Sequence, residues 1–199
     1  MTFFPVRLLS SLVAVLLCSA CIGGTSDEAR FYLLSSEQLA GSGATTSAAI
    51  TQQVELGPIH LAQYLDRPQI VTGTGDNRIA LAEFDRWAGR LSDEISRLLV
   101  QQLSRHQPGL LVRPAPWRLA AAPDVQLELW INQFEGVPGG AARLQARYLL
   151  RRPRRTAQQG QLHYQRQTTG PDYPQLVAAQ AELIADLAAD LARLLGKEP

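Results

Sequence analysis

Cysteine is the most reactive side chain in this sequence, and its two copies lie near the N-terminus, at Cys18 and Cys21. A CxxC spacing occurs in redox pairs, and thiolates at such a spacing also bind metal ions. Here the pair ends an apolar segment (AVLLCSAC), and no βαβ pattern surrounds it. The flanking residues therefore favour a different chemistry, the attachment of a covalent lipid to one of the thiols.

The residues before Cys21 have the layout of a bacterial lipoprotein signal. Arg7 makes a short basic region, residues 8–17 are almost wholly apolar, and the small pair Ser-Ala precedes Cys21. This order is typical of a secretory signal peptide, and the apolar run is too short for a membrane-spanning helix, which needs roughly 20 residues. Cys18 stands where such signals usually have Leu.

We therefore predict that residues 1–20 form a signal peptide and that Cys21 becomes a diacylglycerol-modified N-terminus. The alternative is an ordinary secreted protein cleaved nearby. Cys18 would leave with the signal and Cys21 would be consumed in a thioether, so the mature chain would have no thiol for redox chemistry, catalysis or metal binding. Residues 21–29 would comprise the lipidated cysteine and a short tether, whose eight residues after Cys21 reach at most about 27 Å.

Two further features of the mature chain concern its location and its partners. Ile22, rather than Asp, follows Cys21, which favours export to the outer membrane over retention in the inner membrane. We therefore expect a protein anchored in the inner leaflet of the outer membrane and facing the periplasm. Removal of Arg7 leaves 18 basic and 18 acidic residues, so the net charge gives no indication of nucleic-acid binding.

The rest of the chain offers little catalytic chemistry. The histidines are His60, His106 and His163. None has a metal-ligand partner at a suitable spacing, so we interpret them as surface or helix-cap residues, and we predict no metal, cofactor or enzymatic activity. An enzyme would require a cleft that joins His60 or His163 to a carboxylate. The segment TGTGDN (72–77) lacks the helix and Lys of a phosphate-binding loop and predicts a hairpin turn. We interpret Asp66 and Asp85 as loop-capping carboxylates.

One unusual cluster is basic. Six arginines crowd a short segment: Arg143, Arg147, Arg151, Arg152, Arg154 and Arg155. If Arg143 and Arg147 point outward on a strand, they extend a basic turn. Such a turn would contact anionic lipid headgroups or an acidic partner. A solvated hairpin tip is the alternative interpretation.

The elements that position these residues follow from hydrophobic periodicity. Helical spacing of apolar residues predicts two amphipathic helices, 87–105 and 173–195. Segments with strand patterns are 30–35, 53–61, 69–72, 78–82, 110–113, 125–132, 144–150 and 162–166. We expect a single α/β domain over residues 30–196, in which the two helices pack on a mixed, partly antiparallel sheet of about seven strands. Gly57-Pro58 predicts a bulge within 53–61.

Two tryptophans have different predicted environments. Phe84, Trp87 and Leu91 lie at i, i+3 and i+7, which predicts the start of the first helix packed as a hydrophobic staple. On that helix we expect Glu94 to point outward. Trp130 lies on the polar face of strand 125–132, so we expect a helix, the loop around Trp117 or another chain to cover it.

The order and spacing of several segments resemble a known family, the ABC-type transport auxiliary lipoproteins (the PqiC/YmbA-like family). The matching segments are FYLL (31–34), VELGPIHLAQYLDRPQIV (54–71), FDRWAGRL (84–91), DVQLELWINQFEG (124–136), LQARYLL (144–150) and a terminal Ala/Leu-rich helix. The resemblance covers nearly all of the mature chain. The most specific segments are YLDRPQIV and FDRWAGRL.

The resemblance implies a non-enzymatic subunit with a compact α/β domain. Such lipoproteins accompany mammalian-cell-entry (MCE) proteins and an ABC transporter, which move lipids or other hydrophobic molecules between the inner and outer membranes. The lipoprotein is thought to receive the MCE conduit at the outer membrane. Because MCE proteins form rings, a matching ring or other homo-oligomer is implied as well.

The family supplies no catalytic residues, and Cys21 alone carries over with a defined chemical role. Tyr64, Leu65, Asp66 and Arg67 match a family loop, and Trp87 matches a family helix start. Together with Trp130 they are our candidates for docking a partner. The alternative function is a periplasmic lipoprotein that itself binds a lipid or hydrophobic ligand, or that assists assembly of another envelope complex.

Overall fold

The computed structural model describes residues 28–35, 49–73, 77–116 and 122–196. The predicted signal peptide, Cys21 and the loop around Trp117 lie outside these ranges. Within them, neither helix combines the length and apolarity that crossing a bilayer requires.

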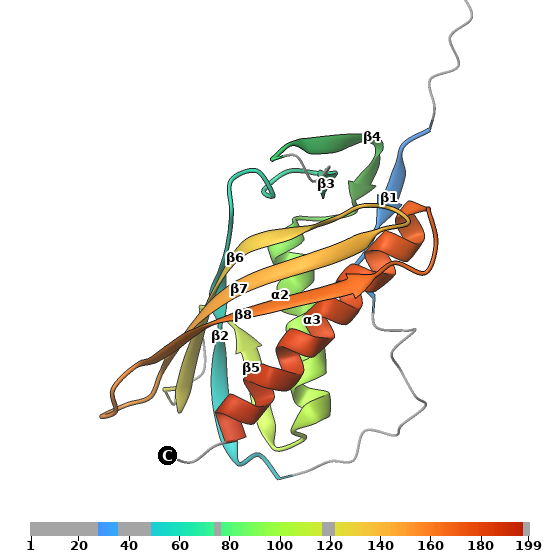
Figure 1. The fold of residues 1–199 in the computed structure, drawn as a ribbon. Helices are drawn as coiled ribbons and strands as arrows, with labels where there is room; N and C mark the ends of the chain where they lie inside the picture. The colour runs from blue at the N-terminus through green and yellow to red at the C-terminus, as the bar shows by residue number, and fades with distance from the viewer. Residues whose placement is uncertain (1–27, 36–48, 74–76, 117–121, 197–199) are drawn as a thin grey trace, which may run out of the picture.

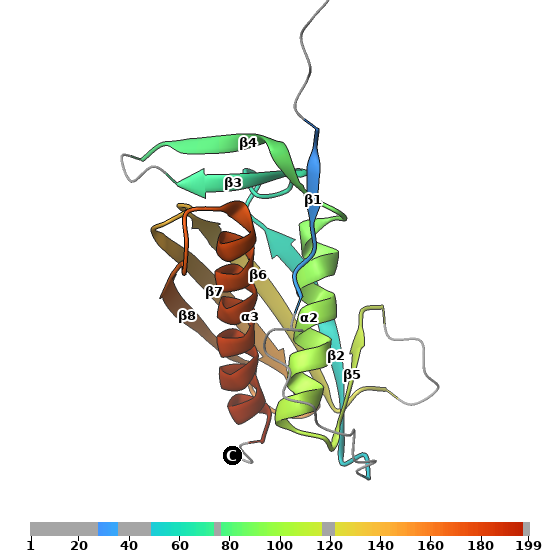
Figure 2. The same cartoon turned by 90° about the vertical axis from the view of Figure 1, so that its right-hand side faces the viewer.

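In the described residues, eight strands form one mixed sheet and two helices pack on it (Figures 1 and 2). The strands are β1 (Arg30–Tyr32), β2 (Gln52–Leu61), β3 (Gln69–Gly73), β4 (Ile79–Trp87), β5 (Leu110–Pro114), β6 (Val125–Gly136), β7 (Ala141–Arg151) and β8 (Gln158–Gln167). The helices are α2 (Leu91–His106) and α3 (Tyr173–Gly196). The predicted single-domain α/β class is confirmed, and each of the eight segments with a strand pattern overlaps one of these strands.

The sheet has a larger and a smaller part. In the larger part the strand order is β5-β2-β6-β7-β8; β2 runs parallel to β5 and β6, while β7 runs antiparallel to β6 and β8. The smaller part consists of β3, β4 and β1, and it joins the larger part where Thr72 of β3 pairs with Gly136 of β6. Figures 1 and 2 show β3 and β4 lying across the end of the molecule where both helices begin, while β1 runs down from that end in the direction of the helices.

The core lies between one face of the larger part and the two helices. Strand β6 alternates as predicted, and β7 does the same with its own inward residues. The buried side chains of the two strands are Val125, Leu127, Leu129, Ile131, Phe134, Ala142, Leu144, Ala146, Tyr148 and Leu150. Helix α3 packs over β7 and β8, and α2 packs over β2 and β5. The leucine stripes of the helices close this face against water, which is the main source of stability in such a domain.

The predicted bulge in β2 is present and sets the direction of the residues after it. The register of β2 against β6 shifts between Leu56 and Ile59, and Gly57 has a φ of +118°, which favours glycine. Leu56 and Ile59 therefore both face the core, and His60 points to the opposite face.

The predicted start of the first helix is wrong. Helix α2 begins at Leu91, while Phe84 and Trp87 belong to β4, which is longer than the predicted 78–82 strand. Pairing with β3 and β1 extends β4, and the Trp87 N–H donates to the Pro68 carbonyl at 2.7 Å. The register of β4 shifts between its pairings with Gln69 and Val71, so a bulged strand produces the spacing that a helix would also produce.

The outward position predicted for Glu94 is also wrong. Glu94 is buried, and its carboxylate accepts a hydrogen bond of 2.7 Å from Arg97 one turn later. The same guanidinium donates to the carbonyl of Leu34, just after β1. A buried carboxylate with a charged partner satisfies the rule that buried charges are paired.

Candidate functional site: the open face of the sheet

The two helices cover one face of the larger part of the sheet, and we call the other the open face. Strand alternation places polar side chains there, because successive residues of a strand point to opposite faces. The described residues on this face include His60, Glu128, Trp130, Arg143, Arg147, Arg151, Gln126 and Gln161. This face holds three of the six clustered arginines and one of the three tryptophans of the sequence.

Trp130 is at the centre of a row of planar side chains that crosses three strands. His60 of β2 and Arg147 of β7 are its register partners on either side. The ring centroids of His60 and Trp130 lie 5.1 Å apart at an angle of 16°, and the Arg147 guanidinium lies 4.6 Å from the Trp130 centroid. We call these three residues the stacked row.

The stacked row gives Trp130 neighbours within the sheet. Side chains from the two neighbouring strands contact its ring, because cross-strand neighbours lie close enough for aromatic and long side chains to touch. The arginine adds a cation–π interaction. Trp130 is half-buried as a result, and its remaining surface faces outward. The loop around Trp117 lies outside the described residues, so cover by that loop or by another chain stays a prediction.

Glu128 connects the stacked row to a second arginine. Its carboxylate lies 2.9 Å from His60 Nε2 and accepts a hydrogen bond of 3.1 Å from Arg151. Burial acts to raise the pKa of Glu128, but the hydrogen bonds to His60 and Arg151 outweigh it and hold this pKa below its usual range. The contact with Glu128 thus holds His60, one end of the stacked row, in addition to the stacking.

His60 and Glu128 supply the histidine–carboxylate pair that an enzyme would need, but they lie on the open face. A cavity of about 270 Å³ lies elsewhere, between the β2 bulge and the first turns of α2, with Pro58 and Ser92 in its wall. Among the residues that the structure describes, no three His, Cys, Asp or Glu side chains gather as metal ligands would.

The turn after β2 contains four of the predicted docking residues, and the structure gives them different environments. Tyr64 donates a hydrogen bond of 2.6 Å to Glu135 on the open face, and burial together with this bond raises the pKa of Tyr64. Leu65 is buried in the core, Asp66 is exposed and Arg67 is half-buried. The turn therefore borders the open face and exposes Asp66 most.

Trp87 lies apart from this face. It is buried, and its ring packs 6.5 Å from that of Phe134. The structure thus brings Tyr64 to the face that carries Trp130, leaves Asp66 exposed in the same turn, and places Leu65 and Trp87 in the core.

The six arginines do not form one surface. Arg143, Arg147 and Arg151 lie on the open face, while Arg154 and Arg155 are exposed in the β7–β8 turn. Arg152 instead turns to the C-terminal end of α3, where it donates to the carbonyls of Leu194 and Leu195 at 3.2 and 3.3 Å. A cation at this end of a helix satisfies free carbonyls and interacts favourably with the helix dipole.

Sequence reasoning missed the role of Asp85, which fastens β1 to β4. Arg30 donates two hydrogen bonds of 2.8 Å to this buried carboxylate, and the Tyr32 hydroxyl donates a third of 2.7 Å. Burial acts to raise the pKa of Asp85, yet these bonds hold it below its usual range. Burial and the bond to Asp85 raise the pKa of Tyr32 to about 12. Arg30 and Tyr32 precede Asp85 by more than 50 residues, and no local sequence pattern indicates contacts between residues so far apart.

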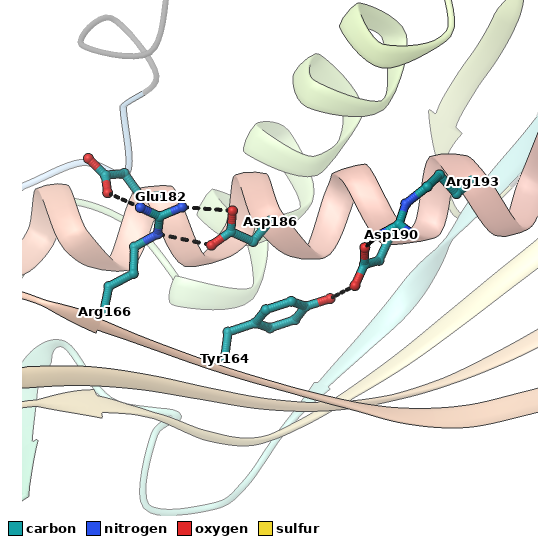
Figure 3. A network of polar contacts seen from close by, with 6 residues as sticks. All are labelled: Tyr164, Arg166, Glu182, Asp186, Asp190 and Arg193. Carbon is teal, nitrogen blue, oxygen red and sulfur yellow. Dashed lines mark hydrogen bonds and ion pairs between the residues drawn. The ribbon is translucent and has the colours of Figure 1, made fainter.

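A second polar network ties the edge strand β8 to α3, as Figure 3 shows. Arg166 bonds both oxygens of Asp186, at 2.9 and 2.8 Å, and lies 3.0 Å from Glu182. Tyr164 donates a bond of 2.7 Å to Asp190, which also pairs with Arg193. Burial and the bond to Asp190 raise the pKa of Tyr164. These contacts hold the sheet edge in place.

A family model of the ABC-type transport auxiliary lipoprotein component matches residues 32–192. The chain belongs to this family. The expected family is thereby confirmed, and with it the general role of an auxiliary component of ABC-type transport and an association of the family with the cell envelope. No curated protein matches the chain.

Solved structures share the fold of this auxiliary lipoprotein. An uncharacterized protein is 20% identical with a TM-score of 0.71, and the match covers 85% of this chain and all of that one. A Xanthomonas campestris protein of the DUF330 family is 16% identical with a TM-score of 0.61, over 75% and 85% of the two chains. A PelC dodecamer from Paraburkholderia phytofirmans is 15% identical over 74% and 91%, but its TM-score of 0.44 supports no inference here.

Proposed function

We propose that this auxiliary lipoprotein is a non-enzymatic docking component, anchored through Cys21 to the inner leaflet of the outer membrane. Its partner is the MCE-domain protein of an ABC-type system that moves lipids or other hydrophobic molecules between the inner and outer membranes. The domain faces the periplasm and presents the open face to this partner. No cofactor is required for that role.

The observation that supports the proposal is the stacked row. Tryptophan and arginine are enriched among the few residues that carry most of the binding energy at protein interfaces. Here a half-buried Trp130 is held between His60 and Arg147, with centroid distances of 5.1 and 4.6 Å. A side chain that is already ordered loses less conformational entropy on binding. The stacked row therefore suits a docking centre.

The surroundings of the stacked row fit a polar rim. Tyr64 borders the open face through its bond to Glu135, Asp66 is exposed in the same turn, and Arg151 pairs with Glu128. Leu65, Arg67 and Trp87 support the turn and the strand behind this surface. Charged and polar residues around an aromatic centre set the orientation and specificity of a partner more than its affinity.

The proposal includes assembly of several copies, as implied for a subunit that meets a ring of MCE proteins. Strand β8 offers an edge for such contacts, because among the described strands it pairs with β7 alone. An unpaired edge of ten residues can receive another strand.

Binding of a lipid within this domain, the alternative function, has less support. The cavity near the β2 bulge measures about 270 Å³, and its wall includes Arg90, Asp93 and Ser96. Pockets for drug-sized ligands are mostly apolar and span about 300–1,000 Å³. A diacyl lipid is larger and more apolar than such ligands.

Photocrosslinking in the intact envelope tests the docking role. A photoreactive residue replaces Gln126 or Trp130 on the open face, or Asp66 in the turn. Gln126 leaves the stacked row intact, and Gln101, exposed on α2, is the matched control on the helix side. We expect capture of one MCE-domain protein from the open-face positions and none from position 101.

Capture from position 101 but not from 126 or 130 would move the docking surface to the helices and contradict the proposed face. Copurified lipid without a protein partner would contradict docking itself and favour a carrier.

A further inference from the structure

Large apolar side chains remain exposed in the described part of the chain: Phe31, Leu33, Ile50, Ile79, Leu81 and Val137. Single exposed apolar residues are common in folded proteins. However, Phe31, Ile79 and Leu81 all lie on the three-stranded part of the sheet, and Val137 follows the Gly136 that pairs with β3. The exposed apolar residues are thus concentrated at one end of the molecule.

Strand pairing shows how these side chains are directed. On β4, Ala82 and Trp87 are buried, so their neighbours Leu81 and Arg86 point away from the core. Phe31 of β1 is the register partner of Arg86 and is 64% exposed. We call the outward surface formed by Phe31, Ile79, Leu81 and Arg86, with the exposed Arg78 just before β4, the end face. In Figures 1 and 2, β4 lies across the end where both helices begin, and β1 starts at that end and runs down from it.

The chain outside the structure indicates what lies next to the end face. Strand β1 starts at Arg30, at this end of the molecule (Figure 2). The eight residues between Cys21 and Arg30 reach at most about 27 Å. A lipid on Cys21 would therefore hold the bilayer close to this end.

The charges of the end face suit phospholipid headgroups. Arg78 is exposed and Arg86 is half-buried, while Glu83 is the exposed carboxylate of β4. Arg30 lies on the other side of β1, where it pairs with the buried Asp85. Arginines beside apolar side chains are typical of surfaces that lie at a membrane interface, where the apolar part enters and the guanidinium meets phosphate.

We propose that the end face rests on the bilayer that holds the lipid anchor, with Phe31, Ile79 and Leu81 entering the headgroup region. This inference depends on the proposed anchoring at Cys21. Three apolar side chains alone bind a membrane weakly, but a tethered surface meets the bilayer at high effective concentration. The anchor therefore makes a small apolar surface sufficient.

The contact fixes the orientation of the domain and gives the basic β7–β8 turn a different partner. Strand β7 has 11 residues and spans up to about 36 Å from the β6–β7 turn to Arg154 and Arg155. The screening length at physiological salt is only about 8 Å. In this orientation, Arg154 and Arg155 face the periplasm and a protein partner, and they do not meet the headgroups of the anchoring leaflet.

Depth-dependent fluorescence in vesicles tests the orientation. Full-length acylated protein is reconstituted into vesicles of phosphatidylethanolamine and phosphatidylglycerol. A single new cysteine at Leu81→Cys, or separately at Phe31→Cys, carries an environment-sensitive dye. Ile50→Cys is the matched control, an exposed apolar position before β2 at the other end of the domain, and Arg154→Cys reports on the basic turn. Circular dichroism verifies that each variant is folded.

We expect dyes at positions 31 and 81 to shift to shorter emission wavelengths and to be quenched by spin-labelled acyl chains. Dyes at positions 50 and 154 should show neither effect. Equal quenching at all positions on vesicle-bound protein would overturn the inference and leave the anchor intact. Protection of position 81 only after addition of an MCE-domain protein would also overturn it, because the end face would then be a protein interface.

Failure of the protein to float with the vesicles would reject the anchoring at Cys21, and the proposed orientation with it. Mass spectrometry of the N-terminal peptide reports the acylation separately. The two failures are therefore distinguishable.

Discussion

The same strands build two different surfaces of this sheet. On β7, Leu144, Ala146 and Leu150 are almost fully buried under α3, while Arg143 and Arg147, on the alternate positions, are exposed. On the covered face, close packing of apolar side chains determines which residues fit. On the open face, cross-strand stacking and ion pairs fix residues that still face outward.

This difference separates stability from function. The covered face should account for most of the free energy of unfolding, because it removes the apolar surface from water. The open face should contribute little to that free energy, since partly exposed ion pairs are worth only about 0–1 kcal/mol each. Its residues are consequently available for recognition at small cost to the fold.

The largest expected effect compares two adjacent leucines on β7. Leu150 is 1% exposed beneath α3, and Leu149 is half-buried on the open face. Leu150→Ala should lower the free energy of unfolding by about 3 kcal/mol, because it leaves a cavity in a packed core. Leu149→Ala is the matched control and should cost under about 1 kcal/mol. Urea unfolding measures both, and equal losses would remove the distinction between the faces.

The alternation of buried and outward-facing residues along each element could be predicted from the sequence, because it depends only on residues close together in the chain. Val125 to Ile131 on β6 and the leucine stripes of both helices have the period of their element. The boundary between β4 and α2 was missed, since the spacing of Phe84, Trp87 and Leu91 fits a helix as well as a bulged strand.

The candidate site was predicted only in part for a related reason. The sequence places Trp130 on the polar face of its strand, but its partner His60 comes from β2, 70 residues earlier. The pairing of Asp85 with Arg30 and the capping of α3 by Arg152 are likewise set by tertiary register. Local patterns carry no information about such contacts.

A buried polar contact gives the next largest effect. Asp85→Asn keeps the size of the side chain but removes the charge that accepts bonds from Arg30 and Tyr32. We expect a loss of about 2 kcal/mol, the order found for hydrogen bonds to charged groups. In hydrogen exchange, the backbone amides of β1 should exchange faster in this variant than in the wild type, and those of β6 should change less. A variant with unchanged β1 protection would show that strand pairing alone holds β1.

A smaller effect on stability is expected in the basic segment, where two nearby arginines have different environments. Arg152 donates to two carbonyls at the end of α3, while Arg154, two residues later, is exposed in the turn. Arg152→Gln should lower the free energy of unfolding by about 1 kcal/mol through loss of the helix-end contact. Arg154→Gln should leave it within about 0.5 kcal/mol of the wild type. Thermal unfolding of both variants measures the difference, and equal shifts would contradict the capping role.

The smallest expected effect is a pH-dependent one on the open face. Because the folded state holds the pKa of Glu128 below its ordinary 4.5, its ionised form stabilises the fold at neutral pH, and this contribution is lost as pH falls through the lowered pKa. Glu128→Gln should therefore be less stable than the wild type at pH 7 by under about 1 kcal/mol. The difference in free energy of unfolding between the variant and the wild type should become smaller when the pH falls below 4.5.

A double-mutant cycle with Arg151→Gln separates the ion pair from other effects of the substitution. Non-additive losses at pH 7 that become additive in acid would assign the stabilisation to the Glu128–Arg151 contact at 3.1 Å. Additive losses at both pH values would mean that this pair contributes nothing to folding. Arg151 and Glu128 would then be retained on the open face for a reason other than stability, which is what a docking surface requires.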